Sequence, residues 1–154
     1  MKNEISNILN LIKNGHNSEA VREAKKLHIK NPTNIDVITI LAYSFIQIGN
    51  FEKVIEILKY GYEEISNNKD YDFFNNMGYA YSQIENYEKS IKFLQSAIEI
   101  YPDNIESYVT LADVYQKLKH YDKAEELINK TLSKAMNDPH GFTIEKNINL
   151  LLLK

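Results

Sequence analysis

The sequence predicts an all-α fold in which short pairs of helices repeat along the chain. Three observations predict it. Two short sequence motifs, called words below, recur at a regular interval; apolar residues recur every three or four positions between them; and turn-forming residues are scarce. The 154 residues include only five glycines and three prolines, too few for a loop-rich β fold. With 44% apolar and 25% charged residues, the composition is typical of a folded globular protein.

Two recurring words mark the repeat. The first has an aromatic residue followed two positions later by lysine, at Phe51, Tyr87 and Tyr121, with spacings of 36 and 34 residues. The second word precedes it and pairs a large residue with a small one: Leu41-Ala42, Met77-Gly78 and Leu111-Ala112. A small residue beside a bulky one predicts a place where two helix backbones approach closely. Periods of this length are typical of helical solenoids.

The segments that follow the aromatic residues have the spacing of amphipathic helices. Over 87–101 and again over 51–65, apolar residues recur at intervals of three and four. Asn50 and Asn86 stand at N-cap positions, where an amide side chain accepts a hydrogen bond from a first-turn N–H group. Pro102 predicts a helix end. Because two short helices cannot bury their apolar faces alone, neighbouring pairs must stack to form a core.

At these residues the sequence resembles the tetratricopeptide repeat, a 34-residue helix–turn–helix unit with the pattern W-x2-L-G-x2-Y…A-x3-F…P. The resemblance divides the chain into four units, 1–34, 35–70, 71–104 and 105–138, followed by a capping helix over 139–154. It implies a right-handed superhelical solenoid of antiparallel helix pairs with a concave groove. The first unit departs from the pattern, because Asn7 and Ile8 replace the large–small pair. The second unit has two extra residues, which we place in the connection at 66–69.

Motifs for catalysis and cofactor binding are missing from the sequence. The chain has no cysteine, which excludes disulfides and thiolate chemistry. It has no Gly-x-Gly-x-x-Gly, no phosphate-binding Gly-Lys-Ser/Thr loop and no His-Glu-x-x-His. The segment 138–140 offers Asp and His, but a metal site needs a third ligand, and a helix start explains Asp-Pro better. We expect no enzyme activity, no cofactor and no metal; an enzyme with an unfamiliar site is the third-ranked hypothesis.

Charge and hydropathy limit the partners and the location. A net charge of −3 provides no positive field to hold a polyanion, so nucleic acid is not expected as a partner. The densest apolar segment, 37–46, has half the length of a membrane-spanning helix. Asparagines interrupt residues 1–13, unlike the apolar stretch of a secretory signal. We therefore expect a cytoplasmic protein without a membrane partner.

The resemblance implies a non-catalytic protein-interaction module, a scaffold whose groove is lined by the first helix of each unit. The residues projected there carry four carboxylates against Lys117, together with several amides and two tyrosines. Amides match the donors and acceptors of a peptide backbone, and tyrosines provide contact area at low entropic cost. We therefore expect a neutral or basic peptide segment or protein surface as the ligand. The expected binding residues are Asp36, Thr39, Tyr43, Gln47, Asp72, Asn75, Tyr79, Gln83, Glu106, Asp113 and Gln116.

One activity of similar repeats is not expected here. Repeats that hold the acidic C-termini of heat-shock chaperones use a clamp of lysine, asparagine and arginine. Asn76 matches the central asparagine of that clamp, but Thr39 and Glu106 stand where its flanking members are required. Glu106 and Asp113 would repel an acidic tail.

The last predicted helix suggests an alternative function. Four consecutive leucines at 150–153 encircle a helix, so they cannot all face the array. Leu150 and Leu153 point away from the stripe that contains Leu151. Two interpretations remain open: a frayed end with exposed leucines, or a docking surface for a second copy or another chain. The alternative function is a self-associating structural protein, a homodimer formed through this helix.

Overall fold

The computed structural model describes residues 1–65 and 71–136, and within these ranges every regular element is a helix. The prediction of an all-α fold is therefore confirmed. Turns of a few residues join neighbouring helices within the described ranges. The eight helices are α1 (Lys2–Lys13), α2 (Asn17–Lys30), α3 (Ile35–Ile46), α4 (Phe51–Ile65), α5 (Tyr71–Gln83), α6 (Tyr87–Ile100), α7 (Glu106–Lys117) and α8 (Tyr121–Met136).

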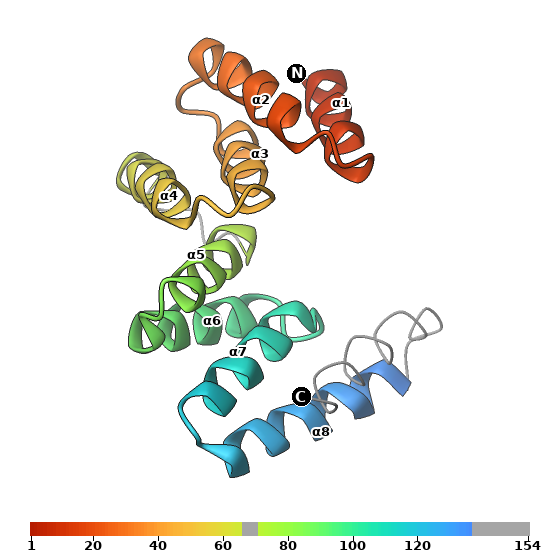
Figure 1. Cartoon of the computed structure of the whole chain (residues 1–154), viewed down its shortest axis with the longest axis vertical. Helices are drawn as coiled ribbons and strands as arrows, with labels where there is room; N and C mark the ends of the chain where they lie inside the picture. Colours follow the sequence, from red (N-terminus) through yellow and green to blue (C-terminus); the bar gives the residue numbers. More distant parts are fainter. Residues whose placement is uncertain (66–70, 137–154) are drawn as a thin grey trace.

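The helices form four pairs that stack into a curved array (Figure 1). Each helix packs on the next one in sequence, and the odd-numbered helices also pack on each other in the order α1, α3, α5, α7. No two even-numbered helices share an extensive contact within the described ranges. The odd-numbered helices therefore line the inner side of the curve. The predicted capping helix, Leu150 and Leu153, and the connection at 66–69 lie outside the described residues.

Asparagine side chains begin three of the helices. Asn34, Asn50 and Asn86 each accept a hydrogen bond from the backbone N–H three residues on, at 3.1, 3.2 and 3.3 Å. Each bond satisfies an amide that has no partner inside the helix. The sequence-based prediction of N-caps at Asn50 and Asn86 is confirmed.

The turn inside each helix pair passes through the left-handed region at the same repeat position. The residues are Gly15, Gly49, Glu85 and Lys119, with φ of +78°, +71°, +61° and +60°. Glycine adopts this conformation without steric cost, whereas a residue with a Cβ atom pays about 1–2 kcal/mol. The first two turns are therefore relaxed, and the last two are strained.

Replacing Glu85 by glycine is expected to raise the free energy of unfolding by about 0.5–1 kcal/mol. The gain is smaller than the strain because glycine also loses more backbone entropy on folding. Urea unfolding followed by circular dichroism measures it. Gln95→Gly, in the exposed interior of α6, is the control and should lose about 1 kcal/mol. A loss at both positions would show that Glu85 is not strained.

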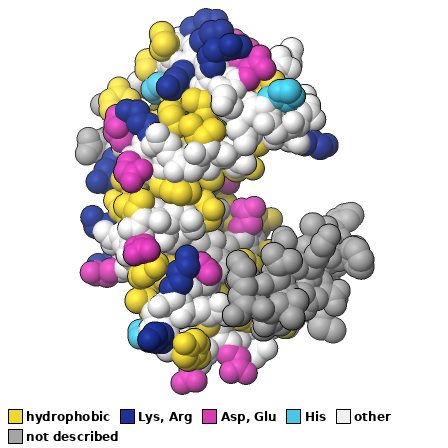
Figure 2. All heavy atoms as spheres, in the orientation of Figure 1, with side chains coloured by type: hydrophobic (Ala, Val, Ile, Leu, Met, Phe, Trp, Pro, Cys, Tyr) yellow, Lys and Arg dark blue, Asp and Glu magenta, His cyan; other side chains and the backbone are white. Residues whose placement is uncertain are grey.

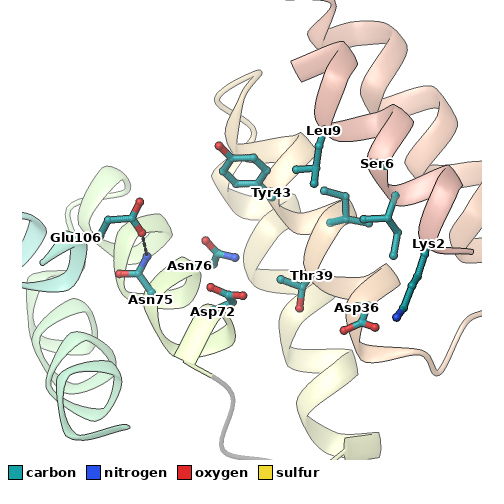
Figure 3. A pocket seen from close by; sticks show the side chains of 12 residues that line it. Lys2, Ser6, Leu9, Asp36, Thr39, Tyr43, Asp72, Asn75, Asn76 and Glu106 are labelled. Atoms are coloured by element: carbon teal, nitrogen blue, oxygen red, sulfur yellow. Dashed lines mark hydrogen bonds between the residues drawn. The ribbon is translucent and has the colours of Figure 1, made fainter. Parts of the chain in front are cut away.

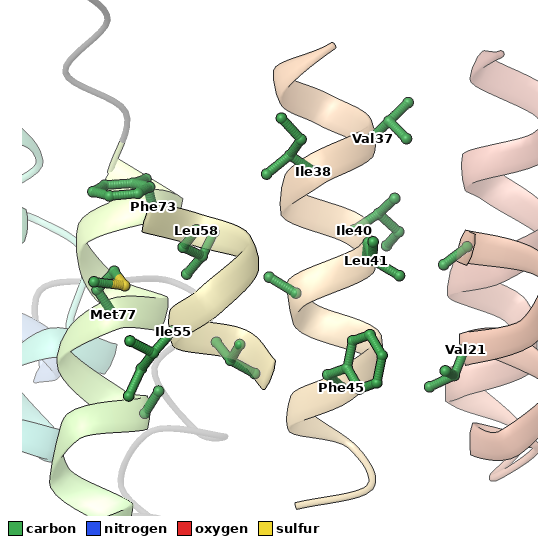
Figure 4. Packing of buried hydrophobic residues seen from close by; sticks show 14 of the residues in the cluster. Val21, Val37, Ile38, Ile40, Leu41, Phe45, Ile55, Leu58, Phe73 and Met77 are labelled. Carbon is green, nitrogen blue, oxygen red and sulfur yellow. The ribbon is translucent and has the colours of Figure 1, made fainter. Parts of the chain in front are cut away.

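The apolar core of the stack consists of clusters of buried side chains between neighbouring helices. Figure 4 shows Val37 and Phe45 on the side of α3 that faces Val21, and Ile38 on the side of α4 and α5. A second cluster joins α6 to α7 through Leu94, Leu111 and Val114. Each pair thus covers the apolar face of its neighbour, as expected for a solenoid.

Among the described glycines, Gly78 has the tightest surroundings. A Cβ atom added there would stand 2.5 Å from Cγ of Leu94, and the Ser90 hydroxyl donates to the Gly78 carbonyl at 2.8 Å. Ala42 and Ala112 occupy the same repeat position and are almost fully buried. The small residues therefore stand where helices α5 and α6, and their counterparts, meet.

Candidate protein-interaction groove

Two adjoining cavities open on the inner side of the array, with volumes of about 560 and 490 Å³. Figure 2 shows this side of the molecule hollowed below the N-terminal helices. The first cavity is lined by residues of α1, α3, α5 and α7, and the second by residues at α3, α5 and α7 with Ile105. Eight of the eleven residues expected in the groove line them: Asp36, Thr39, Tyr43, Gln47, Asp72, Asn75, Tyr79 and Glu106.

The other three expected residues line neither of these cavities. Gln83 and Gln116 lie near the C-terminal ends of α5 and α7, and the Gln83 amide donates to the Ser82 hydroxyl at 3.3 Å. The carboxylate of Asp113 forms an ion pair of 2.9 Å with Lys117, one turn further along α7. The two cavities therefore take residues from the N-terminal and middle parts of α1 and α5, from the whole length of α3 and from the first part of α7.

Sequence reasoning missed two sets of groove residues. Counted from the start of each predicted unit, positions 2, 5, 9, 12 and 13 are projected into the groove, but position 6 also faces the cavities, at Ser6, Ile40, Asn76 and Thr110. The projection leaves out the first unit, yet α1 contributes Lys2, Ile5 and Leu9. The repeat register could have identified both sets, since these residues stand in line with Asp36, Thr39 and Tyr43.

Four residues line both cavities and mark their junction: Tyr43, Asn75, Asn76 and Glu106 (Figure 3). Asn75 joins α5 to α7 there, because its amide donates to Glu106 Oε2 at 3.3 Å. The hydroxyl of Ser107 donates to Asn75 Oδ1 at 2.7 Å. These bonds fix the orientation of the Asn75 carboxamide.

The hydroxyl of Tyr71, the first residue of α5, extends this hydrogen-bonded group. Ser107 also lies 3.2 Å from the hydroxyl of Tyr71, whose ring meets the ring of Tyr101 edge-on at 5.7 Å. Burial raises the pKa of Tyr71 to about 12, and the charges of Glu106 and Asp72 act in the same direction. Tyr71 therefore stays protonated throughout the neutral pH range, and its hydroxyl remains a neutral hydrogen-bonding group.

The surroundings of Glu106 disfavour the negative charge of its carboxylate. Its enclosure by the groove raises the pKa of its carboxyl above the ordinary value of 4.5, and the nearby charge of Asp72 raises it further. Carboxylates with perturbed pKa values in a cleft are typical of functional sites. The negative charges of Glu106 and Asp72 thus lie close enough in the groove to act on each other.

Replacing Glu106 by glutamine is expected to raise Tm at pH 7 by about 1–2 °C, a small effect because solvent screens the partly exposed charge. Folding raises the pKa of this group, so the folded chain binds its proton more tightly than the unfolded chain. The contribution of Glu106 to the free energy of unfolding therefore falls as the pH rises through the raised pKa. Melting curves should differ at pH 7 and coincide near pH 4. An equal difference at both pH values would contradict the electrostatic cause.

Two tyrosines form walls of the groove. Tyr43 is 37% exposed at the junction, and Tyr79 on α5 is half-buried in the second cavity. The ring of Phe51 meets the ring of Tyr79 edge-on, with 5.9 Å between centroids. That contact holds Tyr79 in place, so its ring is preorganised for contact with a ligand.

Two classes of site are not found in the described residues. Within 1–65 and 71–136, His, Asp and Glu side chains never gather in the groups of three or more that hold a metal ion. None of the helices described there has both the length and the apolarity needed to cross a membrane.

Comparisons with known proteins agree with the repeat. Residues 84–148 match the sequence model of the tetratricopeptide repeat. A crystal structure of MamA is similar, with a TM-score of 0.70 and 26% identity over 81% of this chain and 72% of that one. TTC0263, a thermophilic TPR protein in Thermus thermophilus, has a TM-score of 0.77 at 19% identity, covering 93% and 78%. None of the curated proteins matches the chain.

The matched model and the solved structures point to the same kind of unit. The model covers α6, α7 and α8, and the words around Phe51 and Leu41 carry the same pattern toward the N-terminus. The eight described helices fit four repeats. Such arrays serve in general as protein-interaction scaffolds. Residues 84–148 carry the tetratricopeptide repeat, and the recurring words and stacked helix pairs extend the same kind of helix–turn–helix unit toward the N-terminus.

Proposed function

We propose that the chain is a non-catalytic scaffold whose inner groove binds an extended peptide segment or protein surface of neutral or basic character. One observation carries the proposal. Eight residues expected from a single repeat register come together along two adjoining cavities, although they lie in or directly after three different helices. A surface built in this way forms one continuous strip rather than a set of scattered contacts.

The chemistry of the strip suits a peptide. Cavities of this volume accommodate side chains, and their walls combine apolar residues with a few polar groups. Asn75 and Asn76 present amides, which have both donors and acceptors and so match a peptide backbone. Tyr43 and Tyr79 present rings with little rotamer freedom to lose, which is why tyrosine is frequent in binding surfaces.

The charges of the strip favour a neutral or basic ligand. The first cavity contains three carboxylates, Asp36, Asp72 and Glu106, against the single ammonium group of Lys2 among its described lining residues. The charged groups of a basic peptide would be attracted, and those of an acidic peptide would be repelled. This distribution also argues against binding of acidic chaperone tails.

Replacing Tyr43 and Tyr79 together by alanine is expected to weaken partner binding at least tenfold, about 1.4 kcal/mol, because both ring contacts are lost. The partner is obtained by affinity capture with the full chain from native cells, followed by calorimetric titration of the purified pair. Tyr60→Ala/Tyr121→Ala removes two exposed rings from α4 and α8 and serves as the matched control.

Equal affinities of the groove variant and the control variant would overturn the proposal. Self-association is distinguished in the same preparation, since sedimentation over a range of concentrations reports the mass of the protein alone. A monomer that loses its partner only in the groove variant is the expected result. The Leu150→Asp/Leu153→Asp variant tests the predicted homodimer separately.

A further inference from the structure

Asn76 lies at the junction of the two cavities, and the polar atoms of its carboxamide are open to them. Asn76 is only 8% exposed, and what remains exposed opens into the groove (Figure 3). None of the described residues donates a hydrogen bond to this side chain or accepts one from it. A bound ligand would satisfy both the oxygen and the amino group of Asn76.

A carboxylate faces the same space from α7. Glu106 is the only charged side chain among the described residues that line the second cavity, and it also lines the first. One of its oxygens accepts a long bond of 3.3 Å from Asn75, which leaves most of its acceptor capacity open. Asp72 adds a second negative charge on the α5 side of the first cavity.

An aromatic ring completes the junction. Tyr43 reaches it from α3, is 37% exposed, and lines both cavities. A carboxylate, an amide oxygen and an aromatic face together match one side chain better than the others. The guanidinium of arginine is planar, donates in a fork to a carboxylate, and stacks on aromatic rings, whereas the ammonium of lysine is a compact, strongly hydrated charge.

We propose, on the basis of the groove function above, that an arginine side chain of the ligand enters this junction. Its guanidinium donates to the Glu106 carboxylate and to the Asn76 side-chain oxygen, and its stem lies along the ring of Tyr43. The Asn76 amino group donates to a carbonyl of the ligand backbone. The junction thus selects for arginine at one position of the bound peptide and sets the register of that peptide along the groove.

The test uses three acetylated, amidated pentapeptides with alanine and glycine around a central arginine, lysine or citrulline. Citrulline has nearly the shape of arginine but no charge. Each peptide is titrated into the ¹⁵N-labelled full chain and followed by NMR. The arginine peptide is expected to shift the amide signals of α5 and α7, and to bind at least tenfold more tightly than the citrulline peptide. The lysine peptide should lie between them.

Two variants assign the effect to the junction. Glu106→Gln should reduce the arginine-to-citrulline preference to about one, and Asn76→Ala should weaken arginine binding about fivefold, near 1 kcal/mol. Glu99→Gln makes the same charge change on the exposed surface of α6 and should leave the preference intact. Thermal melts verify that each variant is folded.

The arginine inference fails if arginine and citrulline bind equally, if Glu99→Gln acts like Glu106→Gln, or if no signal shifts up to about 10 mM peptide, beyond useful affinity. Binding of the captured partner to the variants distinguishes this failure from a failure of the groove function. Loss of the partner in the Tyr43→Ala/Tyr79→Ala variant, with no effect of Glu106→Gln, keeps the groove and removes the arginine subsite. If the tyrosine variant retains the partner while the unmodified chain prefers arginine over citrulline, the arginine subsite is kept and the groove function is removed.

Discussion

Replacing Leu94 by alanine is expected to lower the free energy of unfolding by about 2–5 kcal/mol. Leu94 is fully buried where α5, α6 and α7 meet, beside Gly78 and in one apolar cluster with Leu111 and Val114. The substitution removes three carbon atoms from the centre of the stack, and rigid helices on all sides cannot close the cavity. Urea unfolding followed by circular dichroism measures the loss.

Gln95→Ala is the control for this prediction. Gln95 is the next residue of α6 and is exposed, so its truncation should change stability by less than about 0.5 kcal/mol. A loss below about 1 kcal/mol for Leu94→Ala would mean that the helices repack around the cavity. In that case the apolar cluster between α6 and α7 would adapt to the lost volume.

Replacing Gly78 by alanine is expected to lower the free energy of unfolding by about 1–3 kcal/mol. The new methyl group would stand 2.5 Å from Cγ of Leu94 and 3.1 Å from its backbone nitrogen. Since a backbone atom is involved, a rotation of the Leu94 side chain relieves only part of the clash. Helices α5 and α6 must separate, which also weakens the bond from Ser90 to the Gly78 carbonyl.

The two substitutions should be coupled. In the Gly78→Ala/Leu94→Ala variant the new methyl group fills part of the cavity, so the loss should be smaller than the sum of the single losses by about 0.5–3 kcal/mol. Gly15→Ala is the control, because a Cβ atom there meets nothing within 4 Å and its cost comes from φ of +78°. Its effect should add to that of Leu94→Ala. Additivity in both pairs would contradict the predicted clash.

The fold could be predicted because its determinants repeat. The large–small pairs at Ala42, Gly78 and Ala112 fall where helices meet, and asparagines begin helices at the predicted N-caps. The strained turns at Glu85 and Lys119 could not be predicted in the same way. Neither residue type indicates positive φ, and only the alignment with Gly15 and Gly49 gives the signal.

The groove could be predicted only in part because its position depends on how helices stack as well as on the register. The repeat register projects positions 2, 5, 9, 12 and 13 inward. The cavities add position 6, which includes Asn76, and do not reach Gln83, Asp113 or Gln116. Asn75 is hydrogen-bonded to Glu106 and Ser107 of α7, whereas Asn76 has no partner among the described residues. This difference depends on the approach of α7 to α5, which no single helix determines.

Each helix packs extensively on helices at most two places away along the chain, so the array has a low contact order. Folding can begin at any pair and spread to its neighbours. The proposed binding surface, in contrast, takes its residues from α1, α3, α5 and α7, one helix from every pair. It is therefore completed only when all four pairs have docked, and a ligand that spans it ties together units that would otherwise open independently.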